Sequence, residues 1–199
     1  MHLSATPLLG SFDIRVHRVW GAVPLLALAW HGTYTVQKLD PGYLLFVCYA
    51  ANLLLGVGIL TRSGLLTGTA FCWIVVGYPL WLYDVIRASD WEPSGLVFHT
   101  SGLLIGALTM RYHLYPRYAW LPALGMGATL QVLARWFTSP TLNVNAAFRV
   151  YEGWEALFNS MLIYRIVMLV GFGTSFAVLI LLNRRFTCIR RGLPSSTGA

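Results

Sequence analysis

The sequence predicts an all-α membrane protein, a bundle of six transmembrane helices with both termini in the cytoplasm. Three observations predict this fold class. The 199 residues are 57% hydrophobic and only 11% charged, whereas a soluble domain carries about a quarter charged residues. Six apolar runs approach the roughly 20 residues that cross a bilayer. Arginines gather at alternate ends of these runs, as in membrane proteins whose loops alternate between two compartments.

The six apolar runs follow a polar N-terminal stretch that lacks a cleavable signal pattern, so the first run is expected to stay as a helix. The runs cover residues 19–36, 43–60, 65–86, 95–110, 119–136 and 162–183. The fourth is short, and Gly125 and Gly127 interrupt the fifth. Short connections between the first five favour antiparallel neighbours. The chain therefore divides into a transmembrane domain, 1–186, and a cytoplasmic tail, 187–199, expected to be disordered.

Basic residues set the orientation of the helices. The set of flanks that includes both termini carries nine arginines: Arg15, Arg18, Arg62, Arg111, Arg117, Arg184, Arg185, Arg190 and Arg191. The opposite flanks carry three basic residues, Lys38, Arg87 and Arg149, together with the acids Asp40, Asp90, Glu92, Glu152 and Glu155. The excess of arginine places both termini inside. Arginine-rich, lysine-poor usage is typical of a bacterial genome rich in G and C, which points to the cytoplasmic (inner) membrane.

Charge and cysteine content exclude two other classes of protein. The net charge of +7 would suit nucleic acid, but the arginines stand at the ends of apolar runs rather than in one basic stripe, so no nucleic acid partner is expected. Cys48, Cys72 and Cys188 are odd in number and form no CxxC pair. The sequence therefore indicates neither a disulfide framework nor a structural metal site.

The longest connection, 137–161, is expected to face the outside. Its large apolar residues recur at three- and four-residue steps, namely Phe148, Tyr151, Trp154, Leu157, Phe158 and Met161. This spacing predicts an amphipathic helix lying on the outer interface. Such a helix is either a lid over a pocket or an anchor without a gating role.

Polar residues from five helices are predicted to lie at one depth, in the outer half of the membrane. Depth along each helix follows from its rise of about 1.5 Å per residue. The residues placed at this depth are His31, Cys48, Asn52, Asp84, His99, Tyr164 and Arg165. Each has a structural alternative, since His and Asn often bond between helices, and Asp84 and Arg165 lie near enough to the interface to reach water. Intramembrane ionisable residues that gather at one depth nevertheless favour a functional pocket, here one that opens outward.

The chemistry open to this pocket includes acyl transfer, in which an imidazole takes the proton of a hydroxyl or thiol nucleophile. His99 is the candidate base, and Cys48 and Thr33 are the candidate nucleophiles. Substrate-binding or orienting roles fall to His31, Asn52, Asp84 and Arg165. The expected substrates are lipid esters entering from the outer leaflet, although the sequence has neither a GxSxG nor an HExxH motif.

Two alternatives stay open. His31 and His99, on different helices at similar depth, are candidates for the axial ligands of a haem b in an electron-transfer protein. The other alternative is a non-catalytic accessory or binding subunit with protein partners in the membrane. The acyl-transfer interpretation itself needs no metal or cofactor.

Two stretches resemble the androgen-inducible-gene family of six-span membrane proteins. "HTSGLLIGALTMRYHLYPRY" is similar to a family segment in which His-Thr opens a helix that ends near Met-Arg, followed by His and Tyr-Pro; these are His99, Thr100, Met110, Arg111, His113, Tyr115 and Pro116. "HGTYTVQKLDPGYLLFV" resembles the family's His-x-Thr-Tyr and its aromatic-led second helix through His31, Thr33, Tyr34 and Tyr43.

The resemblance implies an intramembrane hydrolase that cleaves fatty-acyl esters with a threonine nucleophile and a histidine. The histidine corresponds to His99, but the threonine position falls on Leu45, which cannot attack a carbonyl carbon. Either the threonine aligns elsewhere, or Cys48 or Thr33 replaces it, or the chain has lost this activity. Cys48 is the first replacement to consider, because it is expected one helical turn from Leu45 on the same face.

Overall fold

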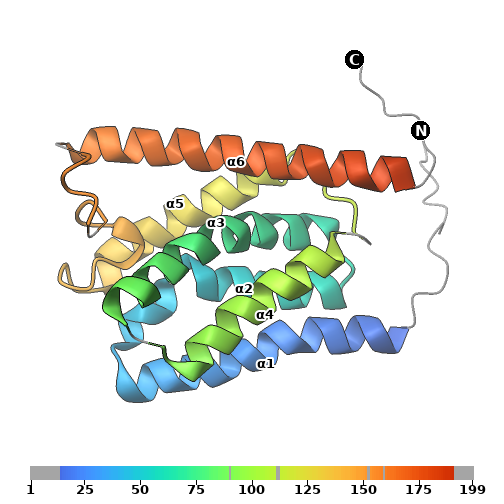
Figure 1. Cartoon of the computed structure of the whole chain (residues 1–199), viewed down its shortest axis with the longest axis horizontal. Helices are drawn as coiled ribbons and strands as arrows, with labels where there is room; N and C mark the ends of the chain where they lie inside the picture. The colour runs from blue at the N-terminus through green and yellow to red at the C-terminus, as the bar shows by residue number, and fades with distance from the viewer. Residues whose placement is uncertain (1–13, 90, 111–112, 152, 159, 191–199) are drawn as a thin grey trace.

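The structure, a computed structural model, describes residues 14–89, 91–110, 113–151, 153–158 and 160–190, and over these ranges it is helical with no β-strand. Its helices are α1 (Ile14–Lys38), α2 (Val47–Leu60), α3 (Gly64–Ala88), α4 (Pro93–Thr109), α5 (Trp120–Phe137) and α6 (Met161–Arg190), with 3₁₀ turns η1 (Pro41–Leu45) and η2 (Val144–Ala146). The helices run roughly along the long axis, and the start of α1 and the end of α6 lie at the same end (Figure 1). The all-α fold with six long helices is therefore confirmed.

Local chemistry sets several helix ends. The Ser63 hydroxyl accepts a first-turn N–H and begins α3, and Ser89 ends it in the left-handed conformation at φ 53°. Pro93 stands at the first position of α4, where its missing N–H costs nothing. The Glu92 carboxylate accepts the next two N–H groups of that helix. These contacts place a carboxylate at the α4 N-terminus, where the helix dipole favours it.

The interior lies where α2 and α4 meet their neighbours, since α2 packs on α1 and α3, and α4 packs on the same two helices. Glycines allow close approach where α4 and α5 cross α3. A Cβ on Gly106 would come within 2.2 Å of the Phe71 ring, and one on Gly127 within 2.3 Å of Trp73. The large side chains therefore fill space that any other residue at those two positions would occupy.

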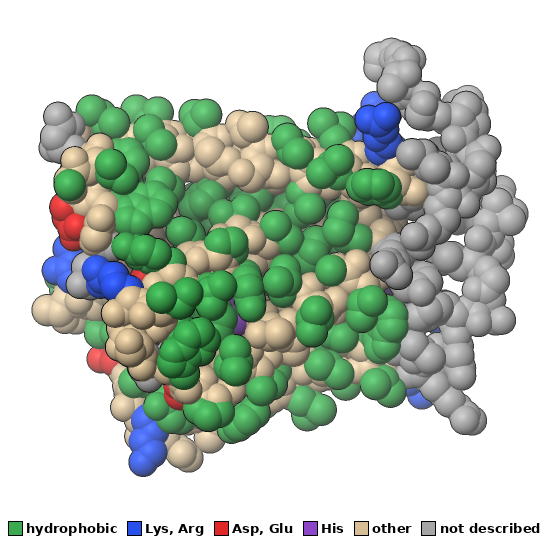
Figure 2. All heavy atoms as spheres, viewed as in Figure 1, with side chains coloured by type: hydrophobic (Ala, Val, Ile, Leu, Met, Phe, Trp, Pro, Cys, Tyr) green, Lys and Arg blue, Asp and Glu red, His purple; other side chains and the backbone are tan. Residues whose placement is uncertain are grey.

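Two of the described helices, α3 and the Met161–Phe186 part of α6, are long and apolar enough to cross a membrane, and α2 is apolar but shorter. α6 packs mainly on α5 and α3 and exposes a row of apolar side chains, including Leu162, Ile166, Leu169, Val170, Leu181 and Phe186. On the face shown in Figure 2, hydrophobic side chains cover the middle and charged ones gather towards the two ends. Crossing by the remaining helices belongs to the proposal below.

The segment predicted as one helix over 43–60 is instead two elements. Phe46, at φ −59° and ψ 139°, separates η1 from α2. The Asn145 side chain stabilises this break, because its amide donates to the Leu45 carbonyl (2.7 Å) and its oxygen accepts from the Val47 N–H (2.9 Å). Leu45 and Cys48 therefore do not share a helix face, and the expectation that they do is wrong.

The amphipathic helix predicted within 137–161 is wrong for the described part of that segment, which holds turns and the short η2. The backbone adopts positive φ at Asn143, Asn145 and Ala146, and such residues do not continue a right-handed helix. The Asn143 side chain accepts from the Phe148 and Arg149 N–H groups at 3.0 Å each. Asparagine bonds to the backbone therefore override the apolar periodicity.

The chain ends differ in part from the predicted domain division. α6 continues to Arg190, so the first four residues of the predicted tail 187–199 are helical. The remainder of the tail lies outside the described residues, as do residues 1–13 and the flanking residues Asp90, Arg111 and Glu152.

Candidate functional site

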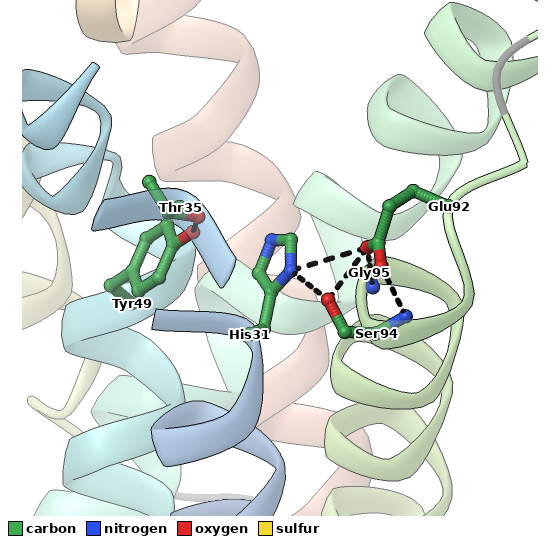
Figure 3. A network of polar contacts seen from close by, with 6 residues as sticks. All are labelled: His31, Thr35, Tyr49, Glu92, Ser94 and Gly95. Carbon is green, nitrogen blue, oxygen red and sulfur yellow. Dashed lines mark hydrogen bonds and ion pairs between the residues drawn. The ribbon is translucent and has the colours of Figure 1, made fainter. Parts of the chain in front are cut away.

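A polar network joins the C-terminal half of α1 to the first turn of α4 (Figure 3). The His31 Nδ1 lies 2.9 Å from the Ser94 Oγ and 3.5 Å from the Glu92 Oε2. The Ser94 hydroxyl also lies 2.7 Å from Glu92 Oε2, to which it can donate. An imidazole, a hydroxyl and a carboxylate thus meet at one point. His31 and Ser94 are 63 positions apart in the sequence.

The carboxylate is held firmly at the helix start. Glu92 accepts from the Ser94 N–H at 2.8 Å and also from the Gly95 N–H. Partial burial works to raise the pKa of Glu92, but the hydrogen bonds from Ser94 and Gly95, with His31 nearby, outweigh it and lower the pKa below its ordinary value. Glu92 is therefore a carboxylate, and a weak base, at neutral pH.

Aromatic rings enclose the imidazole of His31. Its ring centroid lies 5.0 Å from that of Phe98, 5.5 Å from Tyr49 and 6.3 Å from Tyr34, in stacked arrangements. The Tyr49 hydroxyl lies 2.6 Å from that of Thr35, which is fully buried. These rings fix the plane of the imidazole, so Nδ1 stays directed at Ser94 as Figure 3 shows.

His99 lies close to His31, with ring centroids 6.3 Å apart. Its ring stacks on Trp81 at 4.4 Å and meets the edge of Phe98 at 4.9 Å. The structure thus brings the two histidine rings of α1 and α4 together, while their common depth in a membrane stays a prediction. The described hydroxyl–imidazole contact, however, joins Ser94 to His31 and does not involve His99.

The haem alternative can be compared with the residues around this histidine pair. A macrocycle ligated by both imidazoles would lie between them, across the line that joins their rings. Phe98 stands beside that line, about equally distant from the two rings. The side chains as arranged do not fit a haem, and ligation would require Phe98 to move.

The contacts described for the two candidate nucleophiles named from sequence do not include an imidazole. Thr33 is exposed, and its hydroxyl donates to the Ala29 carbonyl of its own helix at 2.8 Å. Cys48 packs against the small cluster of Ala27, Tyr49 and Phe98. Their catalytic roles stay predictions.

Asn52 links α2 to α4. Its amide donates to the Cys48 carbonyl at 3.1 Å, while its buried Oδ1 has no hydrogen-bond partner. Gly102 lies directly against that oxygen, since a Cβ there would come within 2.4 Å of it. Asn52 thus contacts α4 on a glycine face rather than joining the His31 network.

Asp84 and Arg165 contact the 137–161 connection instead of the two histidines. The Tyr151 hydroxyl donates to Asp84, and Arg165 Nη2 donates to the Ala147 carbonyl at 3.1 Å. The predicted layer of polar groups therefore forms at least two separate sets of contacts, one between α1 and α4 and the other beneath the connection.

Sequence reasoning missed Ser94 and Glu92 as site residues, and it also missed Trp81. The signal for the first two was present in "WEPSG": an acid before proline marks a helix start, which places Ser94 in the first turn beside the Glu92 carboxylate. No pattern in the sequence connects Trp81 with His99, since they lie on different helices.

The position that the family resemblance assigns to threonine, Leu45, packs partly buried against the cluster of Ala134, Val144 and Ala147 rather than the cluster that contains Phe98. The resemblance rests on its two sequence stretches, of which Arg111 lies outside the described residues. The chain matches no protein-family model, no curated protein and no solved structure.

Proposed function

We propose that the protein is a six-span enzyme of the bacterial cytoplasmic membrane that hydrolyses or transfers acyl groups of lipid esters at an outward-facing polar pocket. The observation that carries the proposal is the contact of the Ser94 Oγ with both the His31 Nδ1 (2.9 Å) and the Glu92 Oε2 (2.7 Å). An imidazole within hydrogen-bond reach of a hydroxyl is the arrangement that activates serine, and Glu92 is the third group, near both.

Membrane crossing by all six helices is supported by the band of hydrophobic side chains between charged ends (Figure 2) and by the apolar length of α3 and α6. The His31 network lies at the end of the bundle that holds the C-terminus of α1 and the N-terminus of α4 (Figure 1). By the arginine count this is the outer end, where lipid esters of the outer leaflet lie.

The imidazole is the better proton acceptor of the two neighbours of Ser94. An ordinary histidine has a pKa near 6.5 and an ordinary glutamate near 4.3, and the pKa of Glu92 is lowered further. In the proposed reaction the Ser94 hydroxyl first turns its proton from Glu92 Oε2 to His31 Nδ1, which lies 2.9 Å from the same oxygen. Ser94 Oγ then bonds to the ester carbonyl carbon while that proton moves to His31 Nδ1. Glu92, 3.5 Å from that nitrogen, stabilises the imidazolium that forms.

Collapse of the tetrahedral intermediate breaks the ester C–O bond, and His31 returns the proton to the departing alcohol. The acyl group on Ser94 then passes to water or to a second alcohol, which restores the hydroxyl. Ser94 is only 1% exposed, so an ester reaches it only when neighbouring side chains move. Access to the hydroxyl is therefore the step that an experiment must test first.

The test is labelling of the detergent-purified protein with a fluorophosphonate, which reacts with activated serines. We expect labelling of the native chain, its loss in Ser94→Ala, and a fall of about 10³-fold or more in its rate in His31→Ala. Ser101→Ala is the matched control, because Ser101 lies on the same helix and donates only to the Phe98 carbonyl (3.2 Å). Equal labelling of native protein and Ser94→Ala would overturn the assignment of Ser94.

Two further variants separate this proposal from the sequence-based assignment. His99→Ala should retain labelling, because the described ring contacts of His99 are with Trp81, Phe98 and His31 rather than with Ser94. Cys48→Ala should also retain it. Loss of labelling in His99→Ala but not in His31→Ala would return the role of base to His99.

A visible absorption spectrum of the same sample addresses the two alternatives. A Soret band that disappears in His31→Ala would replace acyl transfer by haem b electron transfer. A colourless protein that takes no label would leave His31, Ser94 and Glu92 as a structural link between α1 and α4, as expected of an accessory subunit.

A further inference from the structure

Two arginines converge on one backbone oxygen at the outer ends of α5 and α6. Arg135 Nε donates to the Ala147 carbonyl at 2.6 Å, and Arg165 Nη2 donates to the same oxygen at 3.1 Å. The two guanidinium groups therefore lie side by side, although they come from different helices. Like charges placed this close repel each other unless an anion lies between them.

No carboxylate among the described residues forms an ion pair with either arginine, and two described acids, Asp84 on α3 and Glu155 on the connection, have other partners. Asp84 accepts from the Tyr151 hydroxyl, and Glu155 accepts from the Gly153 N–H at 2.7 Å. Arg135 faces only the Phe148 ring in addition, 6.0 Å from its centroid. Within the residues that the structure describes, no negative charge therefore pairs with the two guanidinium groups.

The arginines also retain donors. A guanidinium has several N–H groups in one plane, and each of these two uses one nitrogen on Ala147. The Arg165 Nε is buried and has no hydrogen-bond partner. A buried charged donor without a partner is costly, and a tetrahedral oxyanion is the ligand that planar guanidinium donors bind in pairs.

The carbonyl is held where it is by contacts that do not involve the arginines. Gln131, one turn before Arg135 on α5, donates to the Asn145 and Ala146 carbonyls at 3.1 and 3.2 Å. The Ala147 N–H donates to the Val144 carbonyl at 3.1 Å. These hydrogen bonds hold the loop in place, so the two arginines are not required for that purpose.

We propose that Arg135 and Arg165 form a binding site for a phosphate group, and that its source is the headgroup of an anionic phospholipid in the outer leaflet. The neighbouring side chains favour a lipid source, because Trp136 and Phe137 are 75% and 71% exposed at the end of α5, and exposed aromatic residues of this kind lie at the headgroup level. The site does not depend on the acyl-transfer proposal, since it is defined by binding alone.

The test is native mass spectrometry of the full chain released from nanodiscs that contain phosphatidylglycerol and phosphatidylcholine in equal amounts. We expect the native protein to retain phosphatidylglycerol in preference, and Arg165→Gln and Arg135→Gln each to reduce this preference about tenfold. Arg149→Gln is the matched control, because Arg149 is exposed on the same connection and reaches only the Thr141 carbonyl at 3.4 Å. Arg165→Lys retains the charge and should keep part of the preference.

Inorganic phosphate distinguishes the two sources of the group. Competition by millimolar phosphate, with equal binding of the two lipids, would overturn a lipid source and leave a soluble phosphate as the ligand. Equal loss of lipid preference in Arg149→Gln and Arg165→Gln would overturn the site, since a general surface charge would then explain the preference. Because a thermal melt in neutral detergent reports folding of each variant, loss of binding through misfolding is recognised independently.

Discussion

The two polar regions at the end of the bundle where α1 ends and α6 begins satisfy their charges in different ways. Between α1 and α4, the His31 imidazole lies against the Ser94 hydroxyl and the Glu92 carboxylate. Between α5 and α6, Arg135 and Arg165 both donate to one carbonyl. Neither forms an ion pair with a described carboxylate. The first region is complete within the protein, and the second leaves charged donors for a ligand. Polar groups that are not needed to hold the fold together therefore indicate a binding site better than groups that already have partners within the protein.

This comparison predicts that changes in the first region alter stability without any ligand. The largest effect is expected from His31→Ala, which removes a ring packed against Tyr49 and Phe98 and leaves Glu92 without its imidazole neighbour. We expect a loss of about 2–4 kcal/mol in the free energy of unfolding, measured by denaturant titration in a neutral detergent. Thr33→Ala is the control, because Thr33 is exposed and bonds only within α1.

A smaller effect is expected from Ser94→Ala. It removes the hydroxyl that bridges His31 and Glu92 while leaving both neighbours in place. The expected loss is about 1–2 kcal/mol in the same titration. If Arg135→Gln destabilised the protein more than either of these changes, the contrast between the two regions would be incorrect.

The pH dependence of stability sharpens the comparison further. The pKa of Glu92 is lower in the folded protein than its ordinary value, so its ionised form contributes stability that is present above the unfolded pKa near 4.3. That contribution is lost as the pH falls through the folded pKa. Unfolding curves collected between about pH 6 and pH 3 should therefore fall more steeply for the native chain than for Glu92→Gln. Parallel curves would show that Glu92 is not held by its partners at the start of α4.

The smallest effect is expected from Arg135→Gln in neutral detergent. The Ala147 carbonyl keeps its bond from Arg165, and a repulsion is removed, so stability should change by no more than about 0.5 kcal/mol. Added phosphatidylglycerol should then raise the melting temperature of the native chain more than that of the variant, because a ligand stabilises only the state that binds it. Equal increases would contradict the assignment of a ligand to this pair.

Much of the fold could be predicted because its signals are local. The runs 65–86 and 119–136 differ from α3 and α5 by one or two residues at each end, since apolar composition over a fixed length needs no knowledge of the neighbours. The failures occurred where side chains act on a distant backbone. Asn145 breaks the segment 43–60 at Phe46, and Asn143 folds the connection into turns. Neither bond is visible in the periodicity of the segment it changes.

The candidate site divides in the same manner. The sequence placed His31 and His99 at one depth, and their rings lie 6.3 Å apart, because depth along a helix follows from residue number alone. It did not pair His31 with Ser94, nor Arg135 with Arg165. Those pairings depend on which helix faces meet.

The sequence by itself determined that this chain forms six helices and, for α3, α4 and α5, both ends to within two residues, because hydrophobic run length, proline and capping residues act within a few positions. Only the tertiary structure decided which polar groups meet. Close crossings such as that of Phe71 on Gly106 fix the rotation of α4 against its neighbours. That rotation turns Ser94 towards His31, since residues on a helix share a face only at three- and four-residue steps.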